Sequence, residues 1–398
     1  MRATAVLAAL LLVAAPPTAW AATVHTVTAQ RHQGTLAGIT PNGRLQLKQG
    51  GKLLAIPLDK VFRIALQDHP PAPDPRADVQ VRTVNRTRLC GRLVPSGRTI
   101  GVLSRAVGQS VHLDAAKVLG VRFGRKKEES LSEGEFEREL TRPNRDNDQL
   151  FVISPKGVVP FNVAVEKITP SKTIFSWEGE DRTIDTARVA AIVFANPVEP
   201  DRAPASVQLV ETSLLRGELT AFTKGRFIVE LCGAKVSVPT SKVVSIEFAN
   251  PNVVYLSDTD PVKVEEIPFF NHIHPYQRNR NSRKEDGQFL PLRLDGRRYA
   301  RGLGCDTKTI LTYDTAGRFK KFAAVIGIDD AARPNGSVDF IVQGDGKVLL
   351  SKRLTGRNAA VTVSLDISGV KKLSLISDFA DEINVGDHAD WADARVMK

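Results

Sequence analysis

The sequence predicts an all-β protein in which tandem small β-barrel-like repeats are followed by a C-terminal jelly-roll β-sandwich. Short segments alternate apolar and polar residues with period two and are separated by Gly, Asn and Lys turns, which is typical of antiparallel strands. One five-residue pattern occurs four times before residue 251. From Pro291 onward, about eight strand-like segments follow without helical periodicity, as expected for a sandwich.

The N-terminal segment has the features of a secretory signal peptide. Arg2 precedes an unbroken apolar stretch from Ala5 to Ala15, and a small-x-small sequence ends at Ala21. This apolar core is shorter than the ~20 residues that a membrane-spanning helix needs. We therefore expect residues 1–21 to be a signal peptide cleaved near Ala21, which predicts a secreted, periplasmic or cell-surface protein without a transmembrane segment. An uncleaved N-terminal anchor is the alternative.

The repeated pattern is a basic residue, Val, two variable residues, and Ile or Val. Because its two apolar residues lie three apart, a strand can bury both only with a bend or bulge. We expect this pattern to be the closing strand of a small barrel, and the order of strands and turns resembles Sm-like and SH3-like barrels. The pattern occupies residues 60–64, 117–121, 188–192 and 242–246.

The repeats divide the N-terminal two thirds of the chain into predicted units. A charged linker at 125–149 separates the second unit from the third, and within it residues 135–140 could form one or two helical turns. The role expected for the units is spacing or protein interaction, and a binding groove on each unit is the alternative. The predicted units are 22–68, 78–124, 150–197 and 205–251.

Charge and cysteine content restrict the partners. The net charge of +11 could favour nucleic acid, acidic polysaccharide or a lipid surface. The basic residues are dispersed, however, and no arginine-rich tract is interleaved with aromatic residues, so we expect no nucleic-acid partner. Cys90, Cys232 and Cys305 lie in strand-like contexts and are interpreted as buried thiols, although a Cys90–Cys232 bridge stays open.

Several motifs in the C-terminal region occur in the order found in one known family. This region resembles the NPCBM domain, a family of carbohydrate-binding modules first noted beside glycoside hydrolases. The resemblance implies a galactose-binding-like jelly roll over residues 265–398 and a module that is often appended to secreted enzymes. The motifs are Tyr299-x-x-Gly302-Leu303, the Phe319-x-x-Phe322 strand ending in Gly327-Ile328-Asp329-Asp330, Ser337-Val338-x-Phe340-x-Val342-x-Gly344-Asp345-Gly346, and residues 387–394.

The acidic loop at 378–393 is the richest source of sugar-binding side chains in this region. Hydroxyl groups of a sugar need carboxylates, amides or His as partners, and an aromatic ring can cover the apolar face. Each residue also has a structural alternative, since Trp391 could fill the core, His388 could cap a turn, and the aspartates could fix turns. The predicted carbohydrate-binding residues are Asp387, His388, Asp390, Trp391, Asp329 and Asp330.

The same loop could hold structural calcium, an ion that takes six to eight oxygen ligands. Asp378, Asp381 and Asp387 are the candidate ligands, although their spacing is not that of an EF-hand. His272 and His274 would lie on one side of an extended segment and could form half of a metal site. Packing or linkage is the alternative role for this pair, and no other cofactor is expected.

The function predicted from these features is non-catalytic carbohydrate binding, by a module that the β-repeats present. No catalytic triad appears, and no pair of carboxylates is identifiable as the acid and nucleophile of a glycosidase. The first alternative is an extracellular scaffold or protein-interaction protein, with protein partners bound through the repeats. The second is a glycoside hydrolase.

Overall fold

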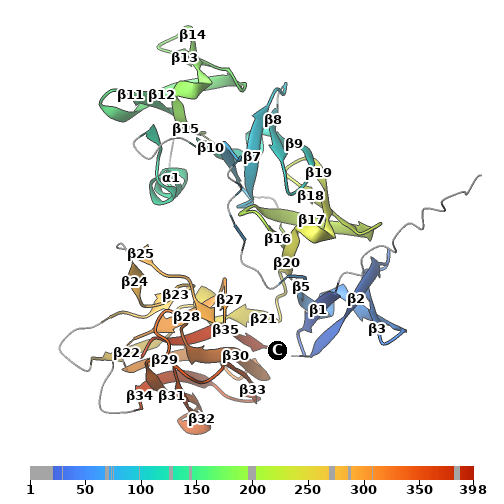
Figure 1. Cartoon of the computed structure of the whole chain (residues 1–398), viewed down its shortest axis with the longest axis vertical. Coiled ribbons are helices and arrows are strands. Elements are labelled where there is room, and N and C mark those ends of the chain that lie inside the picture. Colours follow the sequence, from blue (N-terminus) through green and yellow to red (C-terminus); the bar gives the residue numbers. More distant parts are fainter. Residues whose placement is uncertain are drawn as a thin grey trace, which may run out of the picture.

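The computed structural model describes residues 21–28, 30–67, 71–72, 74, 76–97, 99–124, 129–142, 146–195, 203–268, 274–285, 288–306, 308–380 and 386–398. The predicted all-β class is confirmed. Four five-stranded units and a two-sheet sandwich make up this part of the chain (Figure 1). None of its helices is both long and apolar enough to cross a membrane.

Each of the four units pairs its five strands in the same antiparallel order, fifth–first–second–third–fourth. The first unit contains β1 (Ala21–Thr26), β2 (Arg31–Ile39), β3 (Arg44–Gln49), β4 (Lys52–Pro57) and β5 (Val61–Ala65). The second contains β6 (Val79–Thr83), β7 (Arg88–Val94), β8 (Thr99–Ser104), β9 (Gln109–Asp114) and β10 (Val118–Phe123). The third contains β11 (Asp148–Ser154), β12 (Gly157–Ile168), β13 (Lys172–Trp177), β14 (Glu180–Asp185) and β15 (Val189–Val193). The fourth contains β16 (Ala205–Leu209), β17 (Leu214–Thr223), β18 (Arg226–Leu231), β19 (Ala234–Pro239) and β20 (Val243–Phe248).

The predicted bulge in the repeated pattern is confirmed in every unit. The first and last strands of each unit shift register at the same place, as between His25 and Thr26 opposite β5. Val61 and Ile64 are consequently both fully buried, and the equivalent residues of the other units are buried too. A short 3₁₀ helix precedes the bulged strand in each unit: η1 (Leu58–Lys60), η2 (Ala115–Lys117), η4 (Thr186–Arg188) and η5 (Thr240–Lys242).

The prediction that this strand closes a barrel within its own unit is wrong. Among the described residues, no ladder joins this strand to the fourth strand of its unit, because its second edge pairs with the last strand of another unit. β5 pairs with β20, with Ile64 opposite Ile246, and β10 pairs with β15, with Val121 opposite Ile192. Both pairs are centred on the same position of the repeated pattern, so the first unit joins the fourth and the second joins the third.

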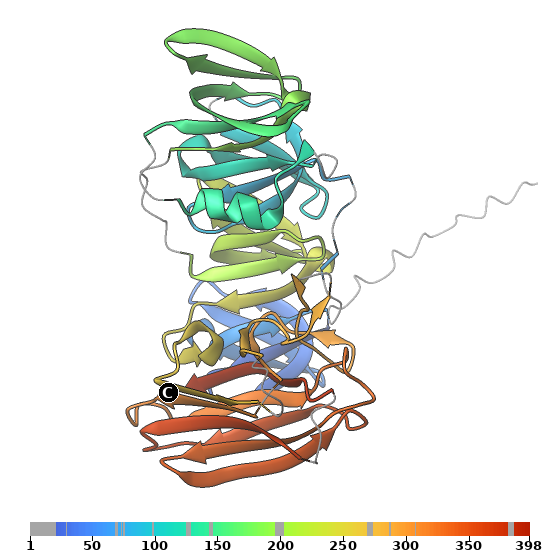
Figure 2. The same ribbon diagram turned by 90° about the vertical axis from the view of Figure 1, so that its left-hand side faces the viewer.

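This pairing stacks the units in a column in an order that differs from their order in the sequence. Figures 1 and 2 both show the third unit at the far end, followed by the second, the fourth and the first, with the sandwich beside the first unit. The second and fourth units also touch, where Leu214 of β17 pairs with Arg88 of β7. One continuous hydrophobic cluster runs through the units.

The helical turns expected at 135–140 form α1 (Glu133–Leu140), which begins with a capping box between Ser132 and Glu135. Phe136 is fully buried against the second and third units. Gly120 makes this contact possible, because a Cβ there would lie 2.8 Å from Leu140 Cδ2.

The C-terminal region is a β-sandwich, as predicted, and its two sheets enclose a separate hydrophobic core. Cys305 in this core, like Cys90 and Cys232 in the repeats, is buried and forms no disulfide among the described residues, as the sequence indicated. The six-stranded sheet contains β21 (Val253–Tyr255), β23 (Gln277–Arg278), β28 (Gly302–Cys305), β30 (Lys321–Ile328), β33 (Val361–Asp366) and β35 (Ala389–Met397). The five-stranded sheet contains β22 (Lys263–Ile267), β29 (Lys308–Asp314), β31 (Ser337–Gly344), β32 (Lys347–Thr355) and β34 (Lys372–Phe379). Two hairpins and a 3₁₀ helix complete it: β24 (Lys284–Glu285) with β25 (Gln288–Phe289), β26 (Arg293–Leu294) with β27 (Arg297–Arg298), and η6 (Leu256–Asp258).

The six-stranded sheet packs on the first unit through the bulged residue of β5. Phe62 and Val27 form a small buried cluster with Ala323 and Met397 of the sandwich. The guanidinium of Arg395 lies 4.9 Å from the centre of the Phe62 ring, a cation–π distance. The bulge that buries two residues of the repeated pattern thus turns a third one toward the sandwich.

Candidate functional site

Three strands of the six-stranded sheet end at the same edge of the sandwich. Asp306 follows β28, Asp329 follows β30, and His388 precedes β35. The register sets Gly304 opposite Asp390 and Ile328 opposite Ala389, so the three polar residues are neighbours. Gly304 has no Cβ, and one placed there would lie 2.4 Å from the carbonyl oxygen of Arg280. Glycine therefore allows the segment after β23 to cross this edge closely.

Asp306 lies between two histidines at this edge. Its Oδ2 is 2.5 Å from His274 Nδ1, and its Oδ1 is 3.5 Å from His388 Nδ1. Ser282, on the crossing segment, places its Oγ 2.9 Å from His388 Nδ1. The His274 side chain is 50% exposed whereas that of His388 is 15% exposed. We call these four residues the end cluster, and it opens to solvent at His274.

The end cluster combines a carboxylate with a neutral imidazole. Burial lowers the pKa of His388, and the carboxylates of Asp306 and Asp329 oppose this only in part. His388 is therefore uncharged at neutral pH, with one ring nitrogen donating and the other accepting. The cluster thus supplies donors and acceptors suited to hydroxyl groups.

Two of the predicted sugar-binding residues form a buried pair beneath the end cluster. Asp390 and Asp329 are 0% and 1% exposed. Burial and then the nearby Asp329 carboxylate raise the pKa of Asp390 well above its ordinary value, which favours its protonated form. Asp329 accepts hydrogen bonds from the backbone amides of Arg293 and Ala331, both at 2.8 Å. These contacts fix the loops and leave neither carboxyl group facing solvent.

Trp391 is part of the sandwich core. Its side chain is 1% exposed, its ring packs edge-on against Phe340 with centroids 5.2 Å apart, and its Nε1 donates to Ser377 Oγ at 2.9 Å. A ring in this position offers no face to a sugar in solvent. The core role that the sequence left open is the one the structure shows.

The other two predicted aspartates bind backbone amides of loops. Asp387 is 4% exposed, and its Oδ1 accepts from the Ser337 amide at 2.6 Å. Asp330 accepts from the amides of Asp295 and Gly296 at 2.9 and 2.7 Å. Of the six predicted residues, His388 is therefore the one that the structure places in the end cluster.

The proposed calcium ligands do not come together in the described residues. Asp378 Oδ2 pairs with Lys308 Nζ at 2.7 Å, while Asp387 binds the Ser337 amide. Asp381 lies outside the described residues, as does His272. Within the part of the chain that the structure describes, no three His, Cys, Asp or Glu side chains are arranged to hold a metal ion.

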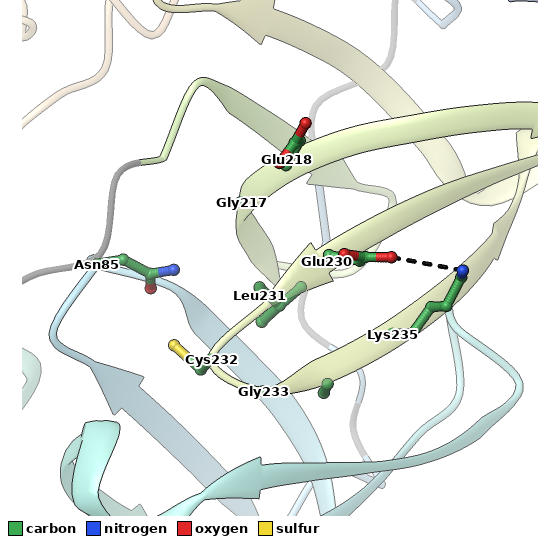
Figure 3. A pocket seen from close by; sticks show the side chains of 9 residues that line it. Asn85, Gly217, Glu218, Glu230, Leu231, Cys232, Gly233 and Lys235 are labelled. Carbon is green, nitrogen blue, oxygen red and sulfur yellow. Dashed lines mark ion pairs between the residues drawn. The ribbon is translucent and has the colours of Figure 1, made fainter. Parts of the chain in front are cut away.

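A separate hollow of about 440 Å³ lies in the repeats, between the turn after β6 and strands β17 to β19 (Figure 3). Glu218 and Glu230 face each other across β17 and β18, and Lys235 Nζ lies 3.4 Å from Glu230 Oε1. Asn85 reaches it from the second unit. None of the predicted site residues lines this hollow. We favour the sandwich edge as the site, because polar groups from four chain segments converge there.

Residues 252–397 match the family model of the NPCBM/NEW2 domain. The C-terminal sandwich is an NPCBM domain. The end cluster lies within it, since His274, Ser282, Asp306 and His388 all fall in the matched range. The chain thus carries a domain of a carbohydrate-binding family.

Two curated relatives match part of this chain. A candidate endo-alpha-N-acetylgalactosaminidase of Renibacterium salmoninarum is 33% identical over 118 residues, which is 29% of this chain and 8% of that protein. The alpha-1,3-galactosidase B of Akkermansia muciniphila is 32% identical over 107 residues, or 26% of this chain and 13% of that protein. The matches thus cover only a small part of the curated relatives.

Solved structures with similarity include two of CBM51 modules. The CBM51 of a Clostridium perfringens GH95 protein, solved with methyl-galactose, is 18% identical with a TM-score of 0.30, over 36% of this chain and 99% of that one. The tandem CBM51 modules of the family 98 glycoside hydrolase from Streptococcus pneumoniae SP3-BS71 are 15% identical with a TM-score of 0.33, over 63% and 88% of the two chains.

Sequence reasoning missed Ser282 and Asp306. Both lie far from the acidic loop along the chain, and Ser282 falls in the polar, basic stretch 277–287, which predicts only a loop. The useful signal for Asp306 is its place directly after the Gly302–Cys305 strand, because residues at strand ends gather at one edge of a sheet. His274 was noted in the sequence, but as half of a metal site.

Proposed function

We propose that this protein is an exported, non-catalytic carbohydrate-binding protein whose NPCBM domain contacts sugar through the end cluster. Cleavage near Ala21 would release it to the periplasm, the cell surface or the medium. The observation that carries the proposal is the position of Asp306 between His274 and His388, at a solvent-accessible edge of a domain from a carbohydrate-binding family.

The chemistry of the end cluster supports sugar binding. A buried carboxylate accepts hydrogen bonds from hydroxyl groups, and an imidazole and a serine hydroxyl can each donate or accept. Asp329 supports these residues from below by fixing the loops. Because the cluster is small and lies at a surface, binding would be modest and reversible.

Galactose-type sugars are the class we propose first. The names of both curated relatives refer to galactose or N-acetylgalactosamine linkages. Those proteins are much longer than the matched segment, so their catalytic activity is not carried over. In this chain the repeats would take the place of an enzyme and hold the NPCBM domain at the end of a column.

A glycan array with the full chain tests this proposal. We expect binding to galactose-type glycans, with a loss of at least about tenfold, equivalent to ~1.4 kcal/mol, in His388→Ala and Ser282→Ala. Lys352→Ala, on the exposed face of β32, is the matched control and should bind as the wild type does. Running the array with calcium and again with a chelator separates the calcium hypothesis, since only a metal-dependent site loses binding on chelation.

If the folded protein binds no glycan on the array, this proposal is contradicted. The extracellular scaffold or protein-interaction protein then becomes the favoured function. Turnover of a bound glycan, detected as released reducing sugar, would instead support the hydrolase alternative.

A further inference from the structure

Five arginines lie near the junction of the repeats and the NPCBM domain. Within the described residues, none of the five forms an ion pair, whereas neighbouring Arg301 pairs with Glu247 and Asp258, and Arg293 pairs with Asp330. We call the five the arginine cluster: Arg86, Arg88 and Arg216 from the repeats, and Arg280 and Arg298 from the NPCBM domain.

The turn between β6 and β7 holds the three repeat arginines together. Asn85 Nδ2 donates to the carbonyl oxygen of Arg216 at 2.6 Å, and the Arg216 amide donates to Thr87 Oγ1 at 2.9 Å. Arg88 Nε donates to the carbonyl oxygen of Thr212 at 2.6 Å. This turn of the second unit is therefore fixed on strand β17 of the fourth unit, with Arg86 and Arg88 on either side of Thr87.

The NPCBM domain contributes the other two arginines from segments that face the repeats. Arg298 ends β27, and Figure 1 shows β27 on the side of the sandwich nearest the repeat column. Arg280 follows β23 and crosses the sheet edge at Gly304. Arg301 ties the same region to the fourth unit, since its Nε lies 3.6 Å from Glu247 Oε2.

The positive charges in the arginine cluster act on one another. Partial desolvation lowers the pKa of Arg298, and the charges of Arg280, Arg293 and Arg88 lower it further. Arg88 belongs to the repeats, so this effect crosses the junction. The pKa of Arg216 is lowered by burial and by the charges of Arg86 and Arg301, and the Glu247 carboxylate opposes this in part. Guanidinium groups stay charged under these conditions, so the five arginines present positive charge at the junction.

We propose that the arginine cluster is a second binding site of this protein, which takes a polyanionic carbohydrate that carries carboxylate or sulfate groups. Guanidinium groups bind both kinds of oxyanion through paired hydrogen bonds. This site uses different residues and a different sugar chemistry from the end cluster. It therefore goes beyond the function proposed above and does not depend on it.

A carbohydrate is the polyanion that the surroundings favour. The arginines lie against a domain of a carbohydrate-binding family. Single-stranded nucleic acid is held by aromatic rings on which successive bases stack. Tyr299, beside Arg298, is buried, and Tyr276 and Phe289 are half-buried. An extended acidic glycan needs only spaced cations, which the cluster provides on both sides of the junction.

The test compares the full chain with two charge-matched triple variants. Arg86→Gln/Arg280→Gln/Arg298→Gln removes three exposed members of the cluster, and Lys52→Gln/Lys347→Gln/Lys352→Gln removes three exposed charges elsewhere. Probes are polygalacturonate for carboxylate, dextran sulfate for sulfate, and unmodified dextran as the neutral polymer. Thermal unfolding of each variant checks that it is folded.

The wild type should bind at least one anionic polymer and not dextran, with affinity falling as salt rises from about 50 to about 300 mM. The arginine variant should lose at least about tenfold in affinity and the lysine variant less than about twofold, because only the first removes clustered cations. Arg298→Gln alone should lose several-fold. His388→Ala should bind the anionic polymer with wild-type affinity. Loss of sugar binding at the end cluster and loss of polymer binding at the arginine cluster can therefore be told apart.

Three results would overturn the inference. The wild type could bind neither anionic polymer at low salt. The lysine variant could lose as much affinity as the arginine variant, which would indicate diffuse charge and not a site. A DNA oligonucleotide could bind more tightly than either polymer and depend on the same arginines, which would assign the site to nucleic acid.

Discussion

Arg63 Nη1 of the first repeat lies 2.8 Å from Asp393 Oδ2 of the NPCBM domain, although 330 residues separate them. Asp393 lies in a bulge of β35 and has a φ of 50°, a conformation that few non-glycine residues adopt. Its side chain and that of Arg63 are 12% and 15% exposed. Burial would raise the pKa of Asp393, but the charges of Arg63, Arg395 and Arg297 lower it overall. The acidic stretch that suggested a sugar site thus ends in a residue that joins the two regions.

Breaking this ion pair should destabilise the junction. Asp393→Asn leaves Arg63 largely buried without its carboxylate, at a cost of about 3 kcal/mol, measured by chemical denaturation. A double-mutant cycle with Arg63→Leu should show coupling between the two positions. Because the folded-state pKa of Asp393 lies below its unfolded value, this stabilisation is present above pH ~4 and is lost as the pH falls through the folded pKa. If the double variant loses as much stability as the two single variants together, the two side chains are not coupled and the pairing is contradicted.

The same junction should become sensitive to mild acid through His25. Burial, followed by the charges of Arg63 and Arg395, lowers the pKa of His25 to about 3. Between that value and the ordinary 6.5, the unfolded chain binds a proton that the folded chain does not, so stability falls as the pH drops below ~6.5. From pH 6.5 to 5 the loss should be about 1–2 kcal/mol. His25→Gln should abolish this loss, whereas His112→Gln, at an exposed histidine, should retain it.

Trp391 should matter for stability and not as a sugar platform. Trp391→Ala removes a fully buried ring from the sandwich core and should cost roughly 3–5 kcal/mol. Trp391→Phe keeps most of the volume and should bind glycans as the wild type does. His388→Ala should show the opposite pattern, with binding lost and the unfolding midpoint little changed. A folded Trp391→Phe protein without glycan binding would show that the indole contacts the ligand.

Gly304→Ala should disturb the end cluster selectively. The added methyl would meet the carbonyl oxygen of Arg280 at 2.4 Å, so the segment carrying Ser282 must move. We expect at least about a tenfold loss of glycan affinity by isothermal titration, or ~1.4 kcal/mol. Gly97→Ala, where nothing lies within 4 Å of the added atom, is the control. Unchanged affinity in Gly304→Ala would show that Ser282 takes no part.

Side-chain patterns in the sequence were sufficient to predict the strands but not the partner of every strand edge. Period-two alternation indicates which residues face a core, and the three-residue spacing of Val61 and Ile64 requires the bulge that all four units contain. Barrel closure was wrongly predicted because strands pair through hydrogen bonds between backbone amides and carbonyls. Every strand carries these groups, so the side chains do not identify the partner. Nothing in the side chains of β5 distinguishes β4 of its own unit from β20 of another.

The sequence predicted only part of the candidate site, because residue types do not reveal which strands pair. Residue types identified His388, but they also selected Trp391 and Asp390, which the sheet register turns inward. Asp306 and Ser282 reach His388 only because β28 pairs with β35 and Gly304 admits the segment after β23. Such long-range pairing is not visible in a local stretch of sequence.

The nested pairing of the units sets the order in which the chain can finish folding. Ile64 finds its partner Ile246 only after about 180 further residues have emerged, which is a contact of very high sequence separation. Until then β5 has an unpaired edge that can recruit strands of other molecules. The second and third units, by contrast, are consecutive in the chain and can join as soon as β15 is made. The centre of the chain should therefore assemble first, and the first unit should wait for the fourth.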